Sequence, residues 1–323
     1  GPGPRHARPA GGPVTSDATP AGMTRRLGAG LIDPAALTAR RIRDPDAIER
    51  AWLARRSATR PADGRLLLVA ADHPARGALS VRGNPRAMSS RVDLLDRLAL
   101  AISRPGVDGV LGTPDVLEDL LLSGLLDDRV IIGSMNRGGV QGAVFELDDR
   151  FTAYTASTLA RLGLDGGKML ARVALDDPGT ANTLEACGRA VTELAQRGLM
   201  AMVEPFMSRR GADGRVVNQL DPDSVITSVQ IASGLGATSA HTWLKLPVVA
   251  QMHRVLDATT LPCLLLGGDP TDSPETTFAT WGAALQHSAA AGLVVGRALL
   301  FPADDDVASA VDRAADLVHG GAR

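Results

Sequence analysis

Short apolar runs alternate with longer segments of helical periodicity from residue 64 to the end of the chain. Each run has the length and continuous hydrophobicity of a parallel strand that is buried on both faces. Amphipathic segments such as 114–126 and 181–198 separate the runs and predict helices. The predicted strands are Leu66–Ala71, Val107–Gly112, Val130–Ser134, Lys168–Val173, Met200–Glu204, Thr242–Leu246, Cys263–Leu266 and Leu293–Gly296.

This alternation predicts the fold class. Eight strands, each followed by a helix, are typical of an α/β protein of the (β/α)₈ TIM-barrel type, which needs about 250 residues. A doubly wound open sheet shows the same alternation and is the structural alternative. No GxGxxG motif follows the first predicted strand, which disfavours a dinucleotide-binding form of that sheet. We therefore expect a TIM barrel.

The N-terminal part of the chain has a different pattern. Residues 1–30 are rich in Gly and Pro and poor in large apolar side chains, which is typical of a disordered extension. Residues 34–58 read as one or two helices. Because they precede the first strand, we expect an N-terminal helical extension that covers the bottom of the barrel. The predicted organisation is a disordered segment, 1–30, and one barrel domain, 31–323.

Composition excludes several classes of function. A formal net charge of −2 gives no electrostatic basis for binding nucleic acid or an anionic membrane. No apolar run reaches the roughly 18 residues of a membrane span, and no signal-peptide pattern is present. Cys187 and Cys263 form no CxxC pair, which favours a reducing compartment. We expect a cytoplasmic homo-oligomer without nucleic-acid or membrane partners.

Polar residues follow several predicted strands, at the edge of the barrel where active sites of this fold lie. They are Asp72 and His73 after the first strand, Asn136 and Arg137 after the third, Glu204 after the fifth and Lys245 in the sixth. Structural explanations compete with functional ones here. Asp72 alternatively caps the following helix, and His73 is better explained by a loop hydrogen bond than by catalysis. Glu204 alternatively pairs with Arg209 or Arg210.

Lysine is rare in this chain, which contains only Lys168 and Lys245 although Lys and Arg together number 34. Arginine replaces a surface lysine easily but cannot replace one whose amine must react. Lys245 lies within the apolar sequence WLKLP and has no evident route to solvent. Lys168 shares a strand face with Arg172 and alternatively pairs with a carboxylate at the barrel bottom.

Together these residues favour imine chemistry on a phosphorylated ketone. An attacking amine must be unprotonated, and a second cation and an apolar wall favour that state. Glycine-rich loops after the last two strands can offer backbone N–H groups to phosphate, and an arginine can add a bidentate contact. The residues concerned are Gly267, Gly268, Gly296 and Arg297. Each glycine alternatively serves only a tight turn.

At these residues the chain resembles the class I aldolases of the deoxyribose-phosphate, tagatose-1,6-bisphosphate and archaeal-type fructose-bisphosphate group. The resemblance covers about residues 64–318 and rests on ADH, GGKMLARV, MVEP, LGATSAHTWLKLP and LLLGGDP…AAGLVVGRALLF. It implies a Schiff base on Lys245, a proton shuttle at Glu204, and supporting roles for Lys168 beside the imine and for Asp72. It also implies that Gly267, Gly268, Gly296 and Arg297 hold the substrate phosphate.

Two departures affect the expected substrate. Phe206 stands where the archaeal branch has a tyrosine, which argues against fructose 1,6-bisphosphate and for Glu204 as the acid–base group. The GGDP loop lacks the serine common in the tagatose branch. The chain is most similar to a branch associated with inositol catabolism, which implies cleavage of 2-deoxy-5-keto-D-gluconate 6-phosphate to dihydroxyacetone phosphate and malonate semialdehyde.

The expected activity is therefore that of a class I aldolase with a phosphorylated small-molecule substrate, no cofactor and no metal. Another phosphoketose or deoxyribose-phosphate aldolase remains an alternative. A non-catalytic phosphosugar-sensing barrel and a phosphosugar isomerase share the phosphate site but need no imine.

Overall fold

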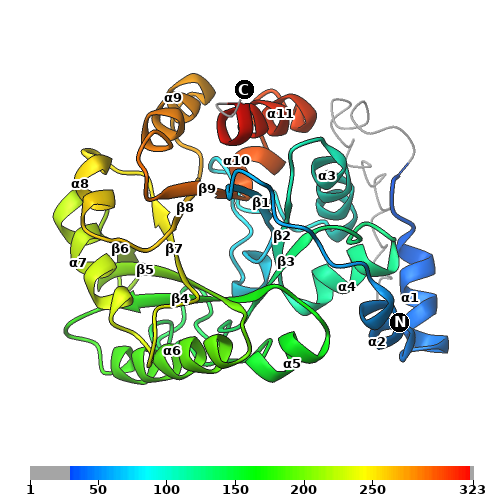
Figure 1. The fold of residues 1–323 in the computed structure, drawn as a ribbon, viewed down its shortest axis with the longest axis horizontal. Helices are drawn as coiled ribbons and strands as arrows, with labels where there is room; N and C mark the ends of the chain where they lie inside the picture. The colour runs from blue at the N-terminus through cyan, green and yellow to red at the C-terminus, as the bar shows by residue number, and fades with distance from the viewer. Residues whose placement is uncertain (1–29, 321–323) are drawn as a thin grey trace, which may run out of the picture.

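Eight parallel strands form a closed barrel at the centre of the computed structural model, which describes residues 30–320 (Figure 1). Neighbouring strands follow the order β4-β3-β2-β1-β9-β8-β7-β5, and pairing of β4 with β5 closes the ring. This closure confirms the predicted TIM barrel and excludes the open-sheet alternative. The strands are β1 (Leu66–Ala70), β2 (Gly109–Gly112), β3 (Val130–Ser134), β4 (Gly166–Val173), β5 (Met200–Arg210), β7 (Thr242–Pro247), β8 (Cys263–Leu266) and β9 (Ala290–Val295).

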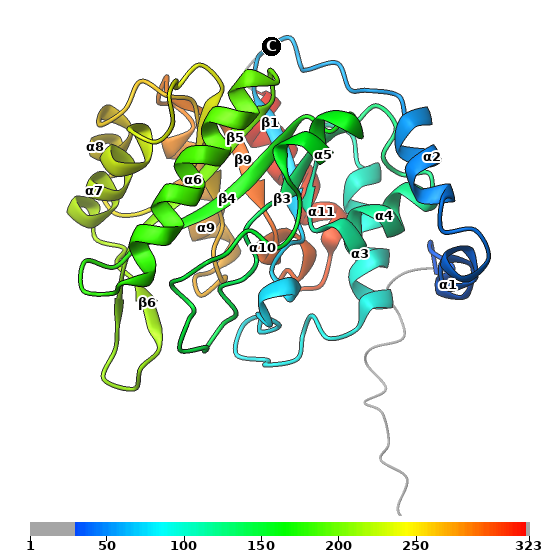
Figure 2. The same cartoon turned by 90° about the horizontal axis from the view of Figure 1, so that it is seen from below.

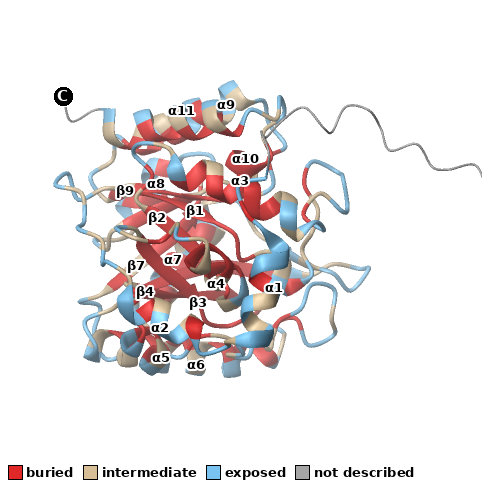
Figure 3. Cartoon of the chain, turned by 90° about the vertical axis from the view of Figure 1, so that its right-hand side faces the viewer, coloured by how far each residue is buried: buried red, intermediate tan, exposed pale blue. Residues whose placement is uncertain are grey.

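Helices cover the outside of the barrel. Figure 3 shows them buried on the side that faces the strands and exposed on the other. Within residues 30–320, no helix is both long and apolar enough to cross a membrane. The helices are α3 (Arg91–Ser103), α4 (Pro114–Leu122), α5 (Ala156–Arg161), α6 (Gly179–Gln196), α7 (Pro222–Ser233), α8 (Met252–Asp257), α9 (Pro274–Ala284), α10 (Arg297–Leu300) and α11 (Val307–His319), with a 3₁₀ turn, η1 (Pro74–Arg76).

Strand side chains alternate between two hydrophobic clusters. In β1, Leu67 and Val69 pack in the large cluster shared with the outer helices, whereas Leu66 and Leu68 pack in a second, smaller cluster. The smaller cluster is made of alternate strand residues and lies inside the barrel, as the two-residue period of a strand requires. The same alternation directs side chains into the interior at the carboxyl ends of the strands. Polar residues are able to occupy these positions, and the candidate site lies there.

The N-terminal helices, α1 (Pro34–Arg43) and α2 (Ala47–Ala54), form the expected helical extension but do not cover the barrel bottom. They lie on the flank (Figure 1), where Arg41 of α1 pairs with Asp119 of α4. The chain after α2 covers the bottom instead, because Ala58 packs against the interior cluster. The two helices therefore do not form the predicted cap, whereas the end of the same predicted segment, at Ala58, does cover the bottom. The predicted disordered segment, 1–30, lies outside the described residues except for Gly30.

The fifth strand is longer than predicted. It continues past Glu204 to Arg210 and turns into β6 (Val216–Asn218), which pairs with it antiparallel. This hairpin projects beyond the barrel (Figure 2). The charged Glu204 ends the apolar run, and Pro205, which lacks a backbone N–H, disfavours a central strand, so the sequence pattern stops short of the true end.

Candidate functional site

A cavity of about 580 Å³ opens at the carboxyl ends of the barrel strands. The strand alternation accounts for its polar walls, because Lys168 and Glu204 occupy the same strand faces as interior residues such as Met200 and Met202. All eight residues predicted for chemistry or phosphate binding line this cavity: Asp72, Lys168, Glu204, Lys245, Gly267, Gly268, Gly296 and Arg297.

Glu204 lies between the two lysines of the chain. Its Oε2 is 2.6 Å from the Nζ of Lys168, and its Oε1 is 3.4 Å from the Nζ of Lys245. All three residues are buried, and Lys245 is only 3% exposed. The strand register explains the closeness, because residues 201–203 of β5 face residues 242–244 of β7, and Glu204 and Lys245 come next in line. A carboxylate therefore lies beside the amine that is predicted to react.

Asp72 is held by three side chains rather than by a helix terminus. Its Oδ2 lies 2.9 Å from Lys168 Nζ and 2.9 Å from Arg137 Nη1, and it accepts a hydrogen bond from Ser134 Oγ at 3.3 Å. Arg137 also donates to the backbone carbonyl of Asp72. The capping interpretation of Asp72 is therefore wrong. The sequence places Arg137 after a predicted strand, but no local pattern predicts its contact with Asp72. That contact joins the ends of β3 and β1, which β2 separates in the barrel.

Burial and ion pairing act in opposite directions on the buried charges. Burial by itself raises the pKa of Glu204, but attraction to Lys168 and Lys245 outweighs burial and lowers this pKa to about 2. Burial likewise raises the pKa of Asp72, and Lys168 and Arg137 bring it well below its usual value. Both carboxylates are therefore ionised at neutral pH, so that Glu204 is able to accept a proton.

The ends of β8 and β9 form a part of the cavity suited to an anion. Gly268 has a left-handed φ of 65°, and no atom lies within 4 Å of the position that its Cβ would occupy. A Cβ on Gly296 would lie 2.6 Å from the carbonyl oxygen of Ala70, so a side chain there requires the backbone to shift. The Nε of Arg297 is buried without a hydrogen-bond partner, and the Asp269 carboxylate is 3.9 Å from the Nη1 of Arg297. Backbone that no side chain covers, at Gly268, therefore lies in the same part of the cavity as Arg297, a cation whose carboxylate partner is 3.9 Å away.

A second group of ion pairs, which the sequence did not indicate, supports another part of the cavity wall. Arg172 Nη1 lies 2.6 Å from Glu146 Oε1, and Arg76 Nη1 lies 2.6 Å from Asp149 Oδ2. These pairs tie β4 and η1 to the long segment between β3 and α5. Because the partners are distant in sequence, only the folded chain brings them together.

Two other structural alternatives are also wrong. Arg210 pairs with Asp177 at 2.9 Å instead of with Glu204. Lys168 does bind carboxylates, but they are Asp72 and Glu204 at the cavity and not a partner at the barrel bottom. Phe206 also lines the cavity.

Comparison with known proteins places this chain in a recognisable group. A model of the family described as Cgl0159-like matches residues 64–315. The crystal structure of Cgl0159 from Corynebacterium glutamicum is 53% identical, with a TM-score of 0.87, and the match covers 90% of this chain and 99% of that chain. No curated protein matches the sequence.

More distant structures share the fold. An archaeal fructose-1,6-bisphosphate aldolase, described with its catalytic Lys bound to the carbinolamine intermediate, is 20% identical with a TM-score of 0.60, and the match covers 84% of this chain and all of that one (100%). A fructose-bisphosphate aldolase from Slackia heliotrinireducens is 16% identical with a TM-score of 0.52, covering 92% of this chain and 95% of that chain.

Proposed function

The chain belongs to the Cgl0159-like family, and we propose from the chemistry of its barrel cavity that it is a class I aldolase. It cleaves a phosphorylated keto-sugar or keto-sugar acid through a Schiff base on Lys245. The observation that carries the proposal is the buried amine of Lys245, 3.4 Å from the ionised carboxylate of Glu204 in the barrel cavity. A nucleophile and an acid–base group at this separation are the two parts that imine-based bond cleavage requires.

The reaction begins when the unprotonated amine of Lys245 attacks the ketone carbon of the substrate. The carbinolamine loses water and becomes an iminium ion, which withdraws electrons from the neighbouring carbon–carbon bond. The bond that breaks joins the carbon next to the iminium to the following carbon, and Glu204 takes the proton from the hydroxyl on that following carbon, which becomes the aldehyde carbon. The bond then breaks, releasing an aldehyde and leaving an enamine on Lys245. The same carboxyl returns its proton to the enamine carbon, and water hydrolyses the iminium to release the second product.

Lys168 and Asp72 hold the reacting groups in place. Lys168 binds one oxygen of Glu204 at 2.6 Å, which leaves the other oxygen directed towards Lys245. Asp72 is anchored by Arg137 and by Lys168, so it is suited to orient substrate hydroxyls or the carbinolamine. The two carboxylates also provide the negative charge that a buried ammonium group such as Lys168 needs.

The phosphate of the substrate binds at the ends of β8 and β9. Arg297 supplies charge, and the backbone around Gly267, Gly268 and Gly296 approaches the ligand closely because it has no side chains in the way. The archaeal aldolase that shares this fold acts on a phosphorylated sugar by name, which agrees with this assignment.

For the substrate itself we propose 2-deoxy-5-keto-D-gluconate 6-phosphate, cleaved to dihydroxyacetone phosphate and malonate semialdehyde. This choice rests on the sequence resemblance, and it agrees with the presence of Phe206 in place of the tyrosine of the archaeal branch. Both the ketone and the phosphate of this molecule fall within the dihydroxyacetone phosphate half, which the cavity would hold between Lys245 and Arg297.

The test is borohydride reduction of the protein in the presence of a panel of phosphorylated ketones, followed by peptide mass spectrometry. Dihydroxyacetone phosphate should add its reduced mass to the peptide that contains Lys245. Release of malonate semialdehyde from the proposed keto-acid phosphate, followed with a coupled dehydrogenase, tests the substrate separately. Absence of any adduct with every ketone would instead support a sensing barrel or an isomerase.

A further inference from the structure

His73 lines the cavity but has no part in the chemistry assigned to Lys245 and Glu204. The loop hydrogen bond expected for it is not found. Within residues 30–320 its Nδ1 is buried without a hydrogen-bond partner, and its side chain, 28% exposed, makes no such bond to the rest of the protein. An unpaired polar group in a cavity costs free energy in the empty protein, and a bound ligand is able to recover it.

The position of His73 follows from where β1 ends. The strand stops at Ala70, and η1 begins at Pro74, so the turn between them brings His73 to the cavity beside Asp72. Had the strand continued, the two side chains would face opposite sides. β1 lies next to β9, and β9 lies next to β8. His73 therefore follows the strand next to β9, which is one of the two strands whose ends carry the anion-binding residues.

The ring of His73 directly adjoins that part of the cavity. Its Cε1 lies 3.5 Å from the position that a Cβ on Gly296 would occupy. Nδ1, the ring atom bonded to Cε1, lies 3.9 Å from Asp72 Oδ1, which is too far for a hydrogen bond. The same edge of the ring is therefore near both the glycine that follows β9 and the carboxylate that binds Lys168.

The surroundings keep this ring uncharged. Burial has the largest effect, and Arg297, Lys245 and Lys168 add to it, so that the pKa of His73 falls to about 3 despite the attraction of Asp72. A neutral imidazole carries one N–H, which either ring nitrogen is able to present. A neutral donor near the Arg297 guanidinium is suited to an anionic ligand, because it adds a directed hydrogen bond without more positive charge.

We propose that His73 is a positioning residue for the phosphorylated end of the substrate, where its ring hydrogen-bonds the phosphate or the ester oxygen that links it to the ketone. This inference rests on the proposed function, since it takes the ends of β8 and β9 as the phosphate site. Arg297, which follows β9, supplies the positive charge. His73, which follows β1, supplies the hydrogen bond. Together they direct the phosphate so that the ketone meets Lys245.

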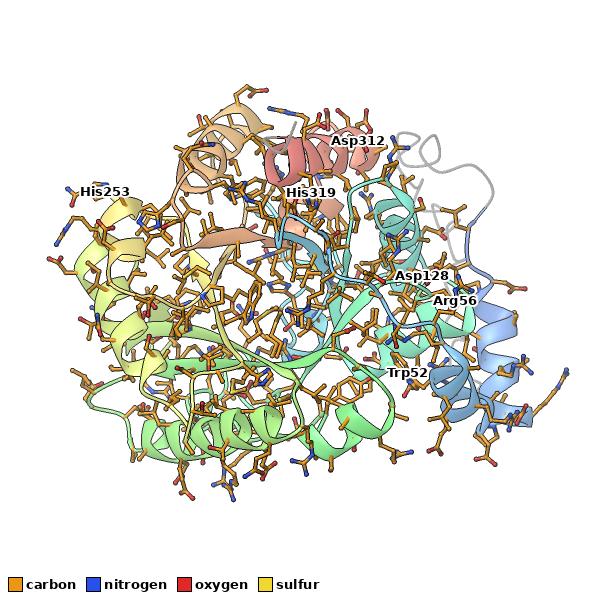
Figure 4. All side chains as sticks on the ribbon, in the orientation of Figure 1. Trp52, Arg56, Asp128, His253, Asp312 and His319 are labelled. Atoms are coloured by element: carbon orange, nitrogen blue, oxygen red, sulfur yellow. The ribbon has the colours of Figure 1, made fainter. Side chains whose placement is uncertain are left out.

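The first measurement uses inorganic phosphate, which needs no imine. Calorimetric titration of wild-type protein and of His73→Ala should show about 10- to 100-fold weaker phosphate binding in the variant, the usual effect of one hydrogen bond to a charged group. His253→Ala is the matched control, because Figure 4 shows His253 on the outside of the molecule and the side chain is exposed. Unchanged phosphate binding in folded His73→Ala would overturn the proposal.

The second measurement separates positioning from local structure. Borohydride trapping on Lys245 should become less efficient for dihydroxyacetone phosphate in His73→Ala but stay unchanged for unphosphorylated dihydroxyacetone. Recovery in His73→Asn or His73→Gln, whose amides place an N–H near one of the two ring nitrogens, would support the hydrogen bond. Equal loss with both ketones would overturn it. If wild-type protein traps neither ketone, the aldolase proposal fails, while the phosphate titration still tests His73.

Discussion

Glu204 of β5 and Lys245 of β7 follow paired residues on these two neighbouring strands, and this register brings the carboxylate oxygen of one to 3.4 Å from the amine of the other. The relationship does not depend on flexible loops, because both residues belong to the barrel wall. A small change at either position should therefore affect chemistry before it affects folding, which makes the pair accessible to substitution.

Replacing Lys245 by methionine should abolish ketone trapping and turnover, because the thioether cannot form an imine. Borohydride and dihydroxyacetone phosphate should then leave the protein mass unchanged, as measured by intact mass spectrometry. Lys168→Gln, which keeps Lys245, should still form the adduct. An adduct that persists in Lys245→Met and maps to Lys168 would show that the Schiff base forms on Lys168 and that the assignment to Lys245 is wrong.

Glu204→Gln should lower kcat by about 10²–10⁴-fold, the usual contribution of a general acid–base group. The amide keeps the shape of the side chain but neither accepts nor returns the proton. Trapping on Lys245 should persist, because imine formation precedes bond cleavage. Glu185→Gln on the exposed surface of α6 is the control and should be neutral. Near-normal turnover of Glu204→Gln would move the shuttle elsewhere, with Asp72 the next residue to test.

Arg297→Ala should raise KM for phosphorylated substrates by about 10-fold or more, since it removes a charge-assisted contact. Slow cleavage of unphosphorylated analogues should remain nearly unchanged. Steady-state kinetics on both substrate types measures the difference. An equal decrease for both would show that Arg297 serves the fold, through its contact with the carbonyl of Ser80.

Lys168→Met should move the acidic limb of the kcat/KM profile to higher pH. Glu204 acts as a base only when ionised, and activity is lost as the pH falls through its pKa. Lys168 is the closer of the two lysines that hold this pKa near 2. Without it the opposing effect of burial raises the pKa. The profile should be recorded over the range in which circular dichroism shows folded protein, with Arg189→Met as the surface control. An unshifted acidic limb would contradict the coupling.

Chelators should leave activity unchanged, because the proposed mechanism uses a lysine where class II aldolases use zinc. Residues 30–320 contain no group of three or more His, Cys, Asp or Glu arranged to hold a metal ion. Activity should be assayed after prolonged EDTA treatment and desalting. Loss of activity that a divalent cation restores would rule out the mechanism.

Periodicity along the chain was enough to predict the barrel and to mark the polar residues at its strand ends, and the family resemblance then singled out the four proposed for the chemistry. Buried parallel strands are continuous apolar runs, so the few charged residues within or just after them stand out. Asp72, Lys168, Glu204 and Lys245 were found in this way. The closed ring then brings all strand ends to one place, so residues far apart in sequence converge without any further signal.

Only the tertiary structure decided features that depend on contacts between distant segments. Arg137 reaches Asp72 across an intervening strand, the β5–β6 hairpin extends past Pro205, and the helical extension lies on the flank against α4. His73 turns into the cavity because β1 ends at Ala70, where strand alternation alone predicts the opposite side. Local sequence sets which residues favour a strand or helix. Where an element stops, and which charges then meet, depends on packing and desolvation across the whole fold.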